Sequence, residues 1–204
     1  MKLGATPLTP SKELARCSWA VDPPGSTLYA DYHDYEWGRP LYGRDALFER
    51  LCLEAFQSGL AWITILRKRE GFRRAFDGFD PERVARYGDK DFARLMADAE
   101  IVRNRAKIES AISNARVILD LDTDLSDLLW SFAPKRRARP QRLSDVLAVT
   151  DESKAMAAEL KRRGFRFIGP TTAYALMQAT GMVDDHVRSC WVPRADTAPS
   201  GRPS

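Results

Sequence analysis

Residues 153–181, SKAMAAELKRRGFRFIGPTTAYALMQATG, contain the signals for two helices joined by a short hairpin. Ser153 is a residue type that caps the start of a helix, and Gly164 is the type that ends one. Pro170 is well placed at the first position of a second helix, which Gly181 would end. The segment therefore predicts a helix-hairpin-helix unit.

The hairpin of this unit can bind an anion. Amides of the hairpin and of the next helical turn lack intrahelical partners, while Arg162, Arg163 and Arg166 add positive charge. A DNA phosphate fits there, and the candidate backbone contacts are Arg166, Gly169 and Thr171. A plain pair of packed helices in an all-helical core is the alternative interpretation.

Apolar residues recur with the helical period over most of the chain, and few segments alternate as strands do. We therefore predict an all-α fold in a single domain over 12–193. The ends, 1–11 and 194–204, are expected to be disordered because they lack periodicity. The further predicted helices are one that Asp45 caps and Gly59 stops, one over 61–70, one opened by Asp80 and Pro81, and one over 104–119.

Length and composition exclude several classes of protein. A chain of 204 residues with 44% hydrophobic residues can bury a core without help from disulfides or a metal. No apolar run approaches the roughly 20 residues that a membrane helix needs, and the N-terminus lacks the apolar stretch of an export signal. We expect a cytoplasmic protein that does not bind membranes.

The formal net charge of +4 is mild, but the basic residues are clustered. Each cluster alone is typical of a solvated helix face, whereas four together favour a polyanion as partner. The clusters are Arg67, Lys68, Arg69, Arg73 and Arg74; Arg103, Arg105 and Lys107; Lys135, Arg136, Arg137, Arg139 and Arg142; and Lys161, Arg162, Arg163 and Arg166.

Cysteines and histidines suggest a metal site. Three cysteines in a chain without an export signal argue against a disulfide framework. Cys17 and His33 share one terminal region, and His186 and Cys190, four residues apart, would share one face of a helical turn. A Cys2His2 zinc site would be structural, because no coordination position stays open for water. A buried histidine beside a buried thiol is the alternative.

Aromatic residues are concentrated near the N-terminus, where six of the 24 residues from 19 to 42 are Trp or Tyr. Such rings form either part of a core or a pocket for a planar base. Farther along, Glu54 flanks the apolar stripe of its helix, which by itself indicates a solvated carboxylate. The aromatic residues are Trp19, Tyr29, Tyr32, Tyr35, Trp37 and Tyr42.

With these motifs the chain resembles the DNA-3-methyladenine glycosylase I family. The resemblance implies an all-α helix-hairpin-helix glycosylase fold, with one structural Zn²⁺ that joins the N- and C-terminal segments through Cys17, His33, His186 and Cys190. The matching motifs run from Arg16 to Pro193 and are RCSWA, LYADYHDYEWG, LFERLCLEAFQSGLAWITILRKRE, IVRNRAKIESAISNA, LLWSF, KRRGFRFIGPTTAYALMQATGMVDDHV and the final Cys190.

The resemblance also implies a function: excision of 3-methyladenine from alkylated double-stranded DNA by hydrolysis of the N-glycosidic bond. Glu54 would be the catalytic residue, accepting a hydrogen bond from the flipped base, and the protein is expected to be a monomer. Trp37 lies near the implied pocket in the same motif. The substrate-binding residues carried over are Trp19, Tyr29, Tyr32, Gly59, Leu60 and Trp62.

Two positions separate this chain from relatives in the wider superfamily, and a third is ambiguous. Phe167 replaces the first glycine of the usual hairpin, and Thr171 replaces the lysine that forms a Schiff base in enzymes that also cut the strand. A monofunctional glycosylase that leaves an abasic site is therefore expected. Asp184 matches the superfamily's catalytic Asp, yet the family is described as working without it. A DNA-damage-binding protein without turnover is the alternative, and it is less favoured because the pocket positions are intact.

Overall fold

The computed structural model describes residues 14–195, and this part of the chain is helical and contains no strand. The all-α prediction is confirmed. The elements are α1 (Leu28–Tyr35), α2 (Arg44–Gln57), α3 (Trp62–Ala75), η1 (Asp77–Phe79), α4 (Pro81–Ala85), α5 (Asp89–Ala97), α6 (Arg105–Leu119), α7 (Leu125–Trp130), η2 (Leu143–Asp145), α8 (Asp151–Arg162) and α9 (Pro170–Ala179).

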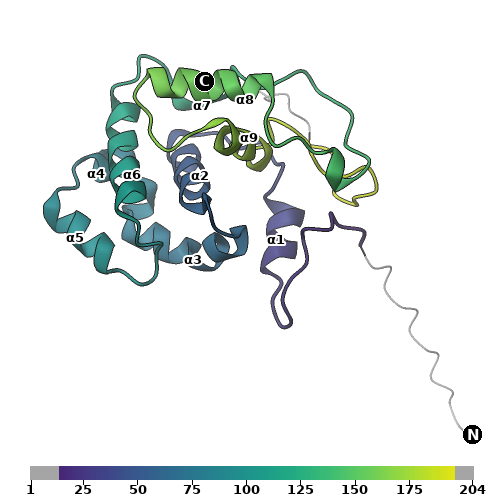
Figure 1. Cartoon of the computed structure of the whole chain (residues 1–204), viewed down its shortest axis with the longest axis horizontal. Coiled ribbons are helices and arrows are strands. Elements are labelled where there is room, and N and C mark those ends of the chain that lie inside the picture. The colour runs from purple at the N-terminus through teal and green to yellow at the C-terminus, as the bar shows by residue number, and fades with distance from the viewer. Residues whose placement is uncertain (1–13, 196–204) are drawn as a thin grey trace, which may run out of the picture.

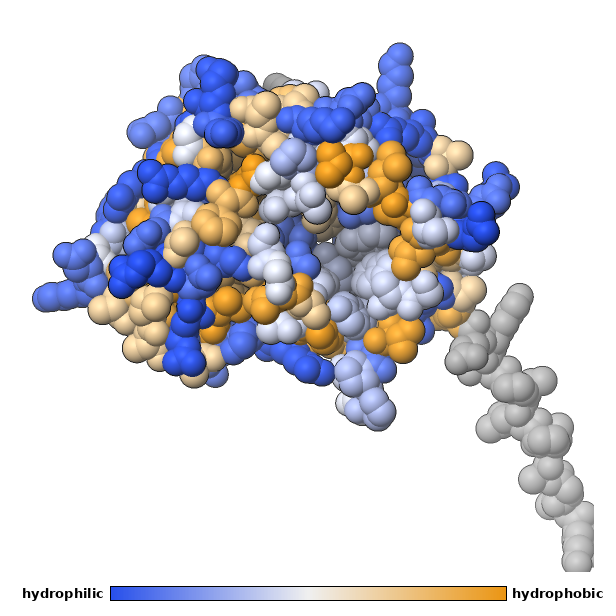
Figure 2. All heavy atoms as spheres, in the orientation of Figure 1, coloured by the Kyte–Doolittle hydropathy of each residue, from blue (hydrophilic) through white to orange (hydrophobic). Residues whose placement is uncertain are grey.

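Helix α2 runs through the middle of the molecule, with α4, α5 and α6 on one side and α1 on the other (Figure 1). Leu47, Phe48 and Leu51 on α2 are completely buried, as an apolar stripe at helical spacing predicts. Phe76 stacks on Phe79 with ring centroids 5.3 Å apart, which extends the core beneath α2 and α3. On the face shown in Figure 2, hydrophilic residues cover most of the surface and apolar residues form small separate patches.

Four predicted helix starts are confirmed and two need correction. Asp80 caps α4, Asn104 caps α6 and Pro170 is the first residue of α9. The helix predicted over 61–70 begins after Ala61 as expected but continues to Ala75. Asp45, however, lies in the first turn of α2, which Gly43 precedes as N-cap. The predicted cap Ser153 is the third residue of α8. The cap is Thr150, whose Oγ1 accepts from the Ser153 amide at 3.3 Å while the Ser153 Oγ accepts from the Thr150 amide at 2.9 Å.

Helices α8 and α9 pack against each other, and the predicted hairpin joins them (Figure 1). After α8, Gly164 has a φ of 98°, and the amide of Phe165 donates to the Leu160 carbonyl at 2.9 Å. This is the arrangement by which a glycine closes a helix C-terminus. Phe167 also has a left-handed backbone, with a φ of 62°, although a side chain disfavours it. The hairpin is therefore held in a strained conformation.

The two predicted disordered ends fall largely outside the described residues. Of the predicted tail 194–204, Arg194 and Ala195 are described and make contacts: Arg194 Nε lies 3.5 Å from the Asp184 carboxylate, and the Ala195 carbonyl accepts from Arg136 at 3.2 Å. Among the helices of residues 14–195, none is both long and apolar enough to cross a membrane.

Candidate functional site

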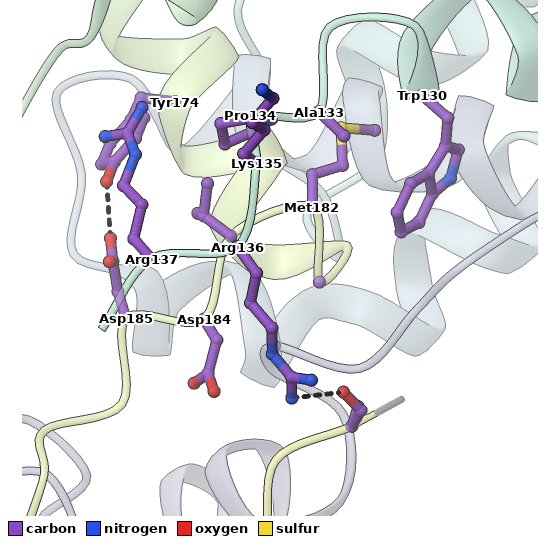
Figure 3. Close-up of a pocket in the computed structure, with 14 residues that line it drawn as sticks. Trp130, Ala133, Pro134, Lys135, Arg136, Arg137, Tyr174, Met182, Asp184 and Asp185 are labelled. Atoms are coloured by element: carbon purple, nitrogen blue, oxygen red, sulfur yellow. Dashed lines mark hydrogen bonds between the residues drawn. The ribbon is translucent and has the colours of Figure 1, made fainter. Parts of the chain in front are cut away.

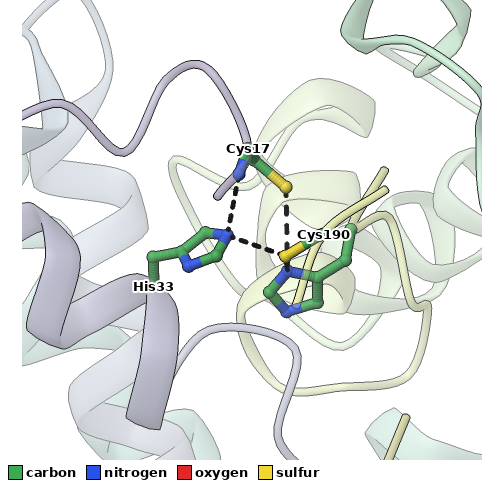
Figure 4. Close-up of side chains that lie close together, drawn as sticks. Cys17, His33 and Cys190 are labelled. Atoms are coloured by element: carbon green, nitrogen blue, oxygen red, sulfur yellow. Dashed lines mark hydrogen bonds between the residues drawn. The ribbon is translucent and has the colours of Figure 1, made fainter. Parts of the chain in front are cut away.

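Four side chains from both ends of the described chain converge in one buried cluster (Figure 4). Cys17 lies in the segment before α1, His33 lies on α1, and His186 and Cys190 follow α9. Their ligand atoms all lie within 4.8 Å of one another. The helical turn expected over DDHVRSC does not form. Instead, a turn in which the Cys190 amide donates to the Val187 carbonyl at 2.9 Å brings the last two residues together.

The spacing of this cluster fits a tetrahedral metal ion. Bond lengths of about 2.3 Å to sulfur and about 2.0 Å to nitrogen place neighbouring S and N ligands about 3.5 Å apart in a tetrahedron. The Sγ of Cys190 lies 3.5 Å from His33 Nε2 and 3.5 Å from His186 Nδ1, and the Sγ of Cys17 lies 3.7 Å from His186 Nδ1. Each pair therefore matches an edge of that tetrahedron.

The surroundings of the cluster also suit a metal. His33 Nδ1 contacts the Asp34 carboxylate at 2.8 Å and His186 Nε2 contacts the Trp37 carbonyl at 3.2 Å, so the other ring nitrogens face inward. Burial lowers the pKa of His186 to about 4, which keeps the imidazole neutral as a ligand must be. Burial raises the pKa of Cys17 to about 12, so a nearby cation is needed to hold its thiolate. Four protein ligands leave no position open for water.

A cavity of about 320 Å³ lies beside this cluster, large enough for a small planar ligand. Five of the predicted site residues line it, together with Trp37. Gly59 and Leu60, predicted as part of the same set, do not line it; they form the turn between α2 and α3. The lining residues are Trp19, Tyr29, Tyr32, Trp37, Glu54, Gln57, Trp62, Leu143, Val146, Ala175 and Gln178.

Hydrogen bonds fix two of the tyrosines in the wall. The Tyr29 hydroxyl accepts from the amide of Ile63 at 3.0 Å, and the Tyr32 hydroxyl accepts from Arg50 Nη1 at 2.9 Å. Trp62 lies against Tyr32 with ring centroids 5.4 Å apart, and its buried indole N–H has no hydrogen-bond partner in residues 14–195. Aromatic rings thus form part of the cavity wall, and hydrogen bonds fix the two tyrosines among them.

Glu54 is the acidic residue of this cavity, and only 5% of its surface is exposed. Burial raises the pKa of the carboxyl to about 7, and the positive charge of Arg50 offsets part of this increase. No hydrogen bond from the described part of the chain reaches this carboxylate. The structure therefore corrects the alternative of a solvated helix residue: Glu54 is a buried, weakly acidic group in the wall of the cavity.

Two tryptophans contact both the Cys/His cluster and the cavity. Trp19 lies two residues after Cys17 and packs edge-on against His33 with ring centroids 5.3 Å apart. Trp37 packs in the same manner against His186 at 4.7 Å. Both indoles also line the cavity. The cluster that closes the chain ends therefore also supports the aromatic wall.

The residues proposed for DNA-backbone contact lie on the outer surface of the hairpin unit. Arg166, Gly169 and Thr171 are exposed, and the first two line a groove between the hairpin and Ser58 of the α2–α3 turn. Arg162 and Arg163, in contrast, form ion pairs with Glu159. The basic clusters are therefore only partly available to a polyanion.

Asp184 does not reach the cavity. Its carboxylate accepts from Arg139 Nε at 2.8 Å, and it lines a second, smaller cavity together with Asp185 (Figure 3). Asp185 accepts from the Tyr174 hydroxyl at 2.7 Å and from Gln178 Nε2 at 2.8 Å. Asp184 thus forms an ion pair with Arg139 that links the 131–142 loop to the C-terminal segment. In this structure Asp184 therefore holds these two segments together.

Several lining residues were not predicted. Gln57 lies one turn beyond Glu54 on the same helix, so its spacing was a usable signal. Ala175 and Gln178 come from α9, and Leu143 and Val146 come from η2 and the residue after it. No local pattern marks these residues, because their common position depends on packing between elements far apart in sequence.

Comparisons with known proteins agree with this arrangement. The family model for methyladenine glycosylase matches residues 19–193. DNA-3-methyladenine glycosylase of Haemophilus influenzae is 43% identical over 181 residues, which cover 86% of this chain and 96% of that protein.

Solved structures give the same result. A crystal structure of 3-methyladenine DNA glycosylase I is 42% identical, covers 87% of this chain and 98% of that one, and superposes with a TM-score of 0.82. A variant of such an enzyme, solved in complex with 3-methyladenine, is 34% identical over 89% of this chain and 99% of that one, with a TM-score of 0.81. The chain belongs to the methyladenine glycosylase family.

Proposed function

We propose that this protein excises 3-methyladenine from alkylated DNA by hydrolysis of the N-glycosidic bond, as a step of base excision repair. The observation that carries this proposal is the cavity of aromatic rings with one buried carboxylate, Glu54, in a chain of this family. Methylation at N3 makes the purine electron-poor, which favours stacking on electron-rich indole and phenol rings. Trp19, Tyr32 and Trp62 would bind the flipped base.

Glu54 would recognise the base and complement its charge. A carboxylate without an internal partner can accept a hydrogen bond from the exocyclic amine of adenine, and a positive charge on the base would favour the ionised form. Cleavage transfers the electron pair of the glycosidic bond to the cationic base, which leaves as neutral 3-methyladenine. Water supplies the hydroxyl group at C1′ and releases a proton. Gly59 and Leu60, which do not line the cavity, would contact the substrate outside it, from the turn that precedes Trp62.

We further propose that the enzyme leaves the DNA strand intact. A Schiff base requires an amine at the site, and the described residues that line the cavity include no lysine. Thr171 occupies the position at which the strand-cutting enzymes of the helix-hairpin-helix superfamily have their lysine. The product is then an abasic site in an unbroken strand.

A structural Zn²⁺, one per chain, would be held by Cys17, His33, His186 and Cys190. The ligand distances and the acceptors behind both histidines support this assignment. When bound, zinc would cross-link the segment before α1 to the segment after α9. Its effect on the cavity would be indirect, through Trp19 and Trp37.

The proposed partner is double-stranded DNA, bound by a monomer. Arg166, Gly169 and Thr171 would contact the phosphate backbone, which fixes register but reads no sequence. A substrate of chromosomal DNA would place the enzyme in the cytoplasm of a bacterial cell.

Release of free base from methylated duplex DNA, followed by chromatography, tests the proposed function. Wild type is expected to release 3-methyladenine, and Glu54→Gln to be roughly ten- to a hundredfold slower, because a charge-assisted hydrogen bond is worth about 1.5 to 3 kcal/mol. Glu49→Gln, on the same helix but paired with Arg73 at 2.8 Å, is the matched control and should keep the wild-type rate. Tight binding without base release by wild type would instead identify a damage-binding protein.

A further inference from the structure

Helix α6 carries a buried lysine that binds the end of another helix. Lys107 is only 7% exposed, although the sequence groups it with a basic surface cluster. Its Nζ donates to the carbonyls of Phe56 at 2.9 Å and Ser58 at 2.6 Å, at the C-terminus of α2. Unpaired carbonyls and the helix dipole favour a cation at this place. Lys107 thus fixes the point where α2 passes into the α2–α3 turn.

The same helix carries a buried amide that binds the hairpin. Asn114 is 1% exposed, and it binds both backbone groups of one residue: its Oδ1 accepts from the Arg166 amide at 2.8 Å, and its Nδ2 donates to the Arg166 carbonyl at 3.1 Å. The next residue, Phe167, has the left-handed backbone described above. Asn114 therefore holds the hairpin at the position where its backbone is strained.

These two contacts bind both loops to one helix. Lys107 and Asn114 are seven residues apart, so they lie on one face of α6 with their Cα atoms about 10 Å apart. The loops that they bind form opposite sides of one groove, lined by Ser58 on one side and by hairpin residues on the other. Gln57 and Trp62, at the ends of the α2–α3 turn, also line the base cavity.

We propose that Lys107 and Asn114 are positioning residues for base excision: from one rigid helix they fix the spacing between the hairpin and the α2–α3 turn. A duplex bound at the hairpin then has its damaged nucleotide in reach of the cavity. This inference rests on the proposed function. It predicts a loss of excision from duplex DNA without a loss of affinity for the free base, because neither residue lines the cavity.

The test uses the full chain with Lys107→Met, Asn114→Leu and the double variant. We expect single-turnover release of 3-methyladenine from duplex DNA to fall at least tenfold in each single variant. Affinity for free 3-methyladenine, measured by quenching of tryptophan fluorescence, should stay within twofold of wild type. Because the loss of either contact already changes the spacing between the loops, the double variant should be at most about threefold slower than the slower single variant.

Ser110→Ala is the matched control. Ser110 is 1% exposed on the same helix, but its hydroxyl donates to the Lys107 carbonyl within α6 and reaches neither loop. It should cost some thermal stability and leave duplex excision within twofold of wild type. Should the first variants not fold, Lys107→Gln and Asn114→Ser, which keep a hydrogen-bonding atom, provide the same comparison.

Three results would overturn the inference: duplex excision within twofold of wild type in both single variants, an equal loss of free-base affinity, or losses that multiply in the double variant. The failure of the proposed function would look different. In that case the wild-type chain itself would release no 3-methyladenine, and the inference would fall with it.

Discussion

The hairpin unit and the cavity with its Cys/His cluster are built in opposite ways. The unit from Thr150 to Gly181 is local: its caps, its turn and its second helix follow one another in 32 residues. The cluster joins Cys17 to Cys190, across almost the whole described chain. The cap and turn bonds of the unit join residues close together in sequence, whereas the cavity depends on both ends of the chain being in place.

This contrast predicts how far the structural effect of a substitution extends. A change at the α8 cap should stay within the hairpin unit, because the two bonds between Thr150 and Ser153 lie inside it. A change in the cluster should reach the cavity, because Trp19 and Trp37 pack directly on two of its histidines. Substitutions at Cys190 and Thr150 test this difference and a substitution at Glu54 tests the burial of the cavity carboxyl, with the largest expected effect first.

Cys190→Ser should remove the metal and open the join between the chain ends. We expect the free energy of unfolding to fall by more than ~4 kcal/mol, since loss of a metal is one of the few changes with effects of this size. The melting temperature should fall by roughly 10 °C in a domain of this length. Metal analysis and calorimetry measure both, and binding of free 3-methyladenine should weaken as well.

The control is Cys52→Ser, which changes a thiol that is also buried but lies outside the cluster, on α2. This variant should keep its metal whatever its stability. Wild-type protein with a zinc content near zero after careful preparation would contradict the assignment of the cluster.

Glu54→Gln should make the protein more stable at neutral and alkaline pH. Burial raises the pKa of this carboxyl from 4.5 to about 7, so the folded state holds the proton more tightly than the unfolded state. That stabilisation is complete below about pH 4.5 and is lost as pH rises to about 7. The variant avoids this loss of about 3 kcal/mol, at about 1.4 kcal/mol per pKa unit.

Denaturant unfolding of both proteins at pH 4 and pH 8 measures this difference. The stability advantage of Glu54→Gln should be larger at pH 8 than at pH 4. An advantage that is the same at both values would mean that the carboxyl titrates normally, as a solvated group would.

Thr150→Ala should have the smallest effect, and a local one. Loss of the α8 cap costs about 1 kcal/mol of stability, because the Ser153 amide loses its acceptor. Metal content and affinity for free 3-methyladenine should not change. Thr150→Ser, which keeps the hydroxyl, should restore stability in the same thermal melt, and a cavity defect in Thr150→Ala would show that the two regions are coupled.

The sequence predicted local structure better than long-range structure. The hairpin, its closing glycines and the starts of α4 and α6 follow from residue types with fixed conformational preferences. The α8 cap was misplaced by three residues because Thr150 and Ser153 are both capping types, and only reciprocal geometry distinguishes their positions. Asp45 was misjudged for a similar reason: an acidic residue suits both a cap and a first turn.

The site was predicted mainly through the family resemblance. Spacing alone left a metal cluster and a core histidine as alternatives, since Cys17 and His186 are 169 residues apart and no local rule joins them. The same limit explains Gln178, which lines the cavity from α9, and the buried Lys107, which looked like surface charge. In each case the environment comes from packing that a linear pattern does not contain.

The late position of the closing contacts has a consequence for how the protein is made. The Trp191 amide donates to the Ala15 carbonyl at 2.8 Å, and its indole N–H donates to Asp34 at 3.2 Å, so the segment before α1 is held in place by residues near the other end. A ribosome synthesises the chain from its N-terminus, at about 5 to 20 residues per second. Trp19 is therefore among the first residues made, but the segment that carries it can be held in its final place only after Trp191 has been synthesised.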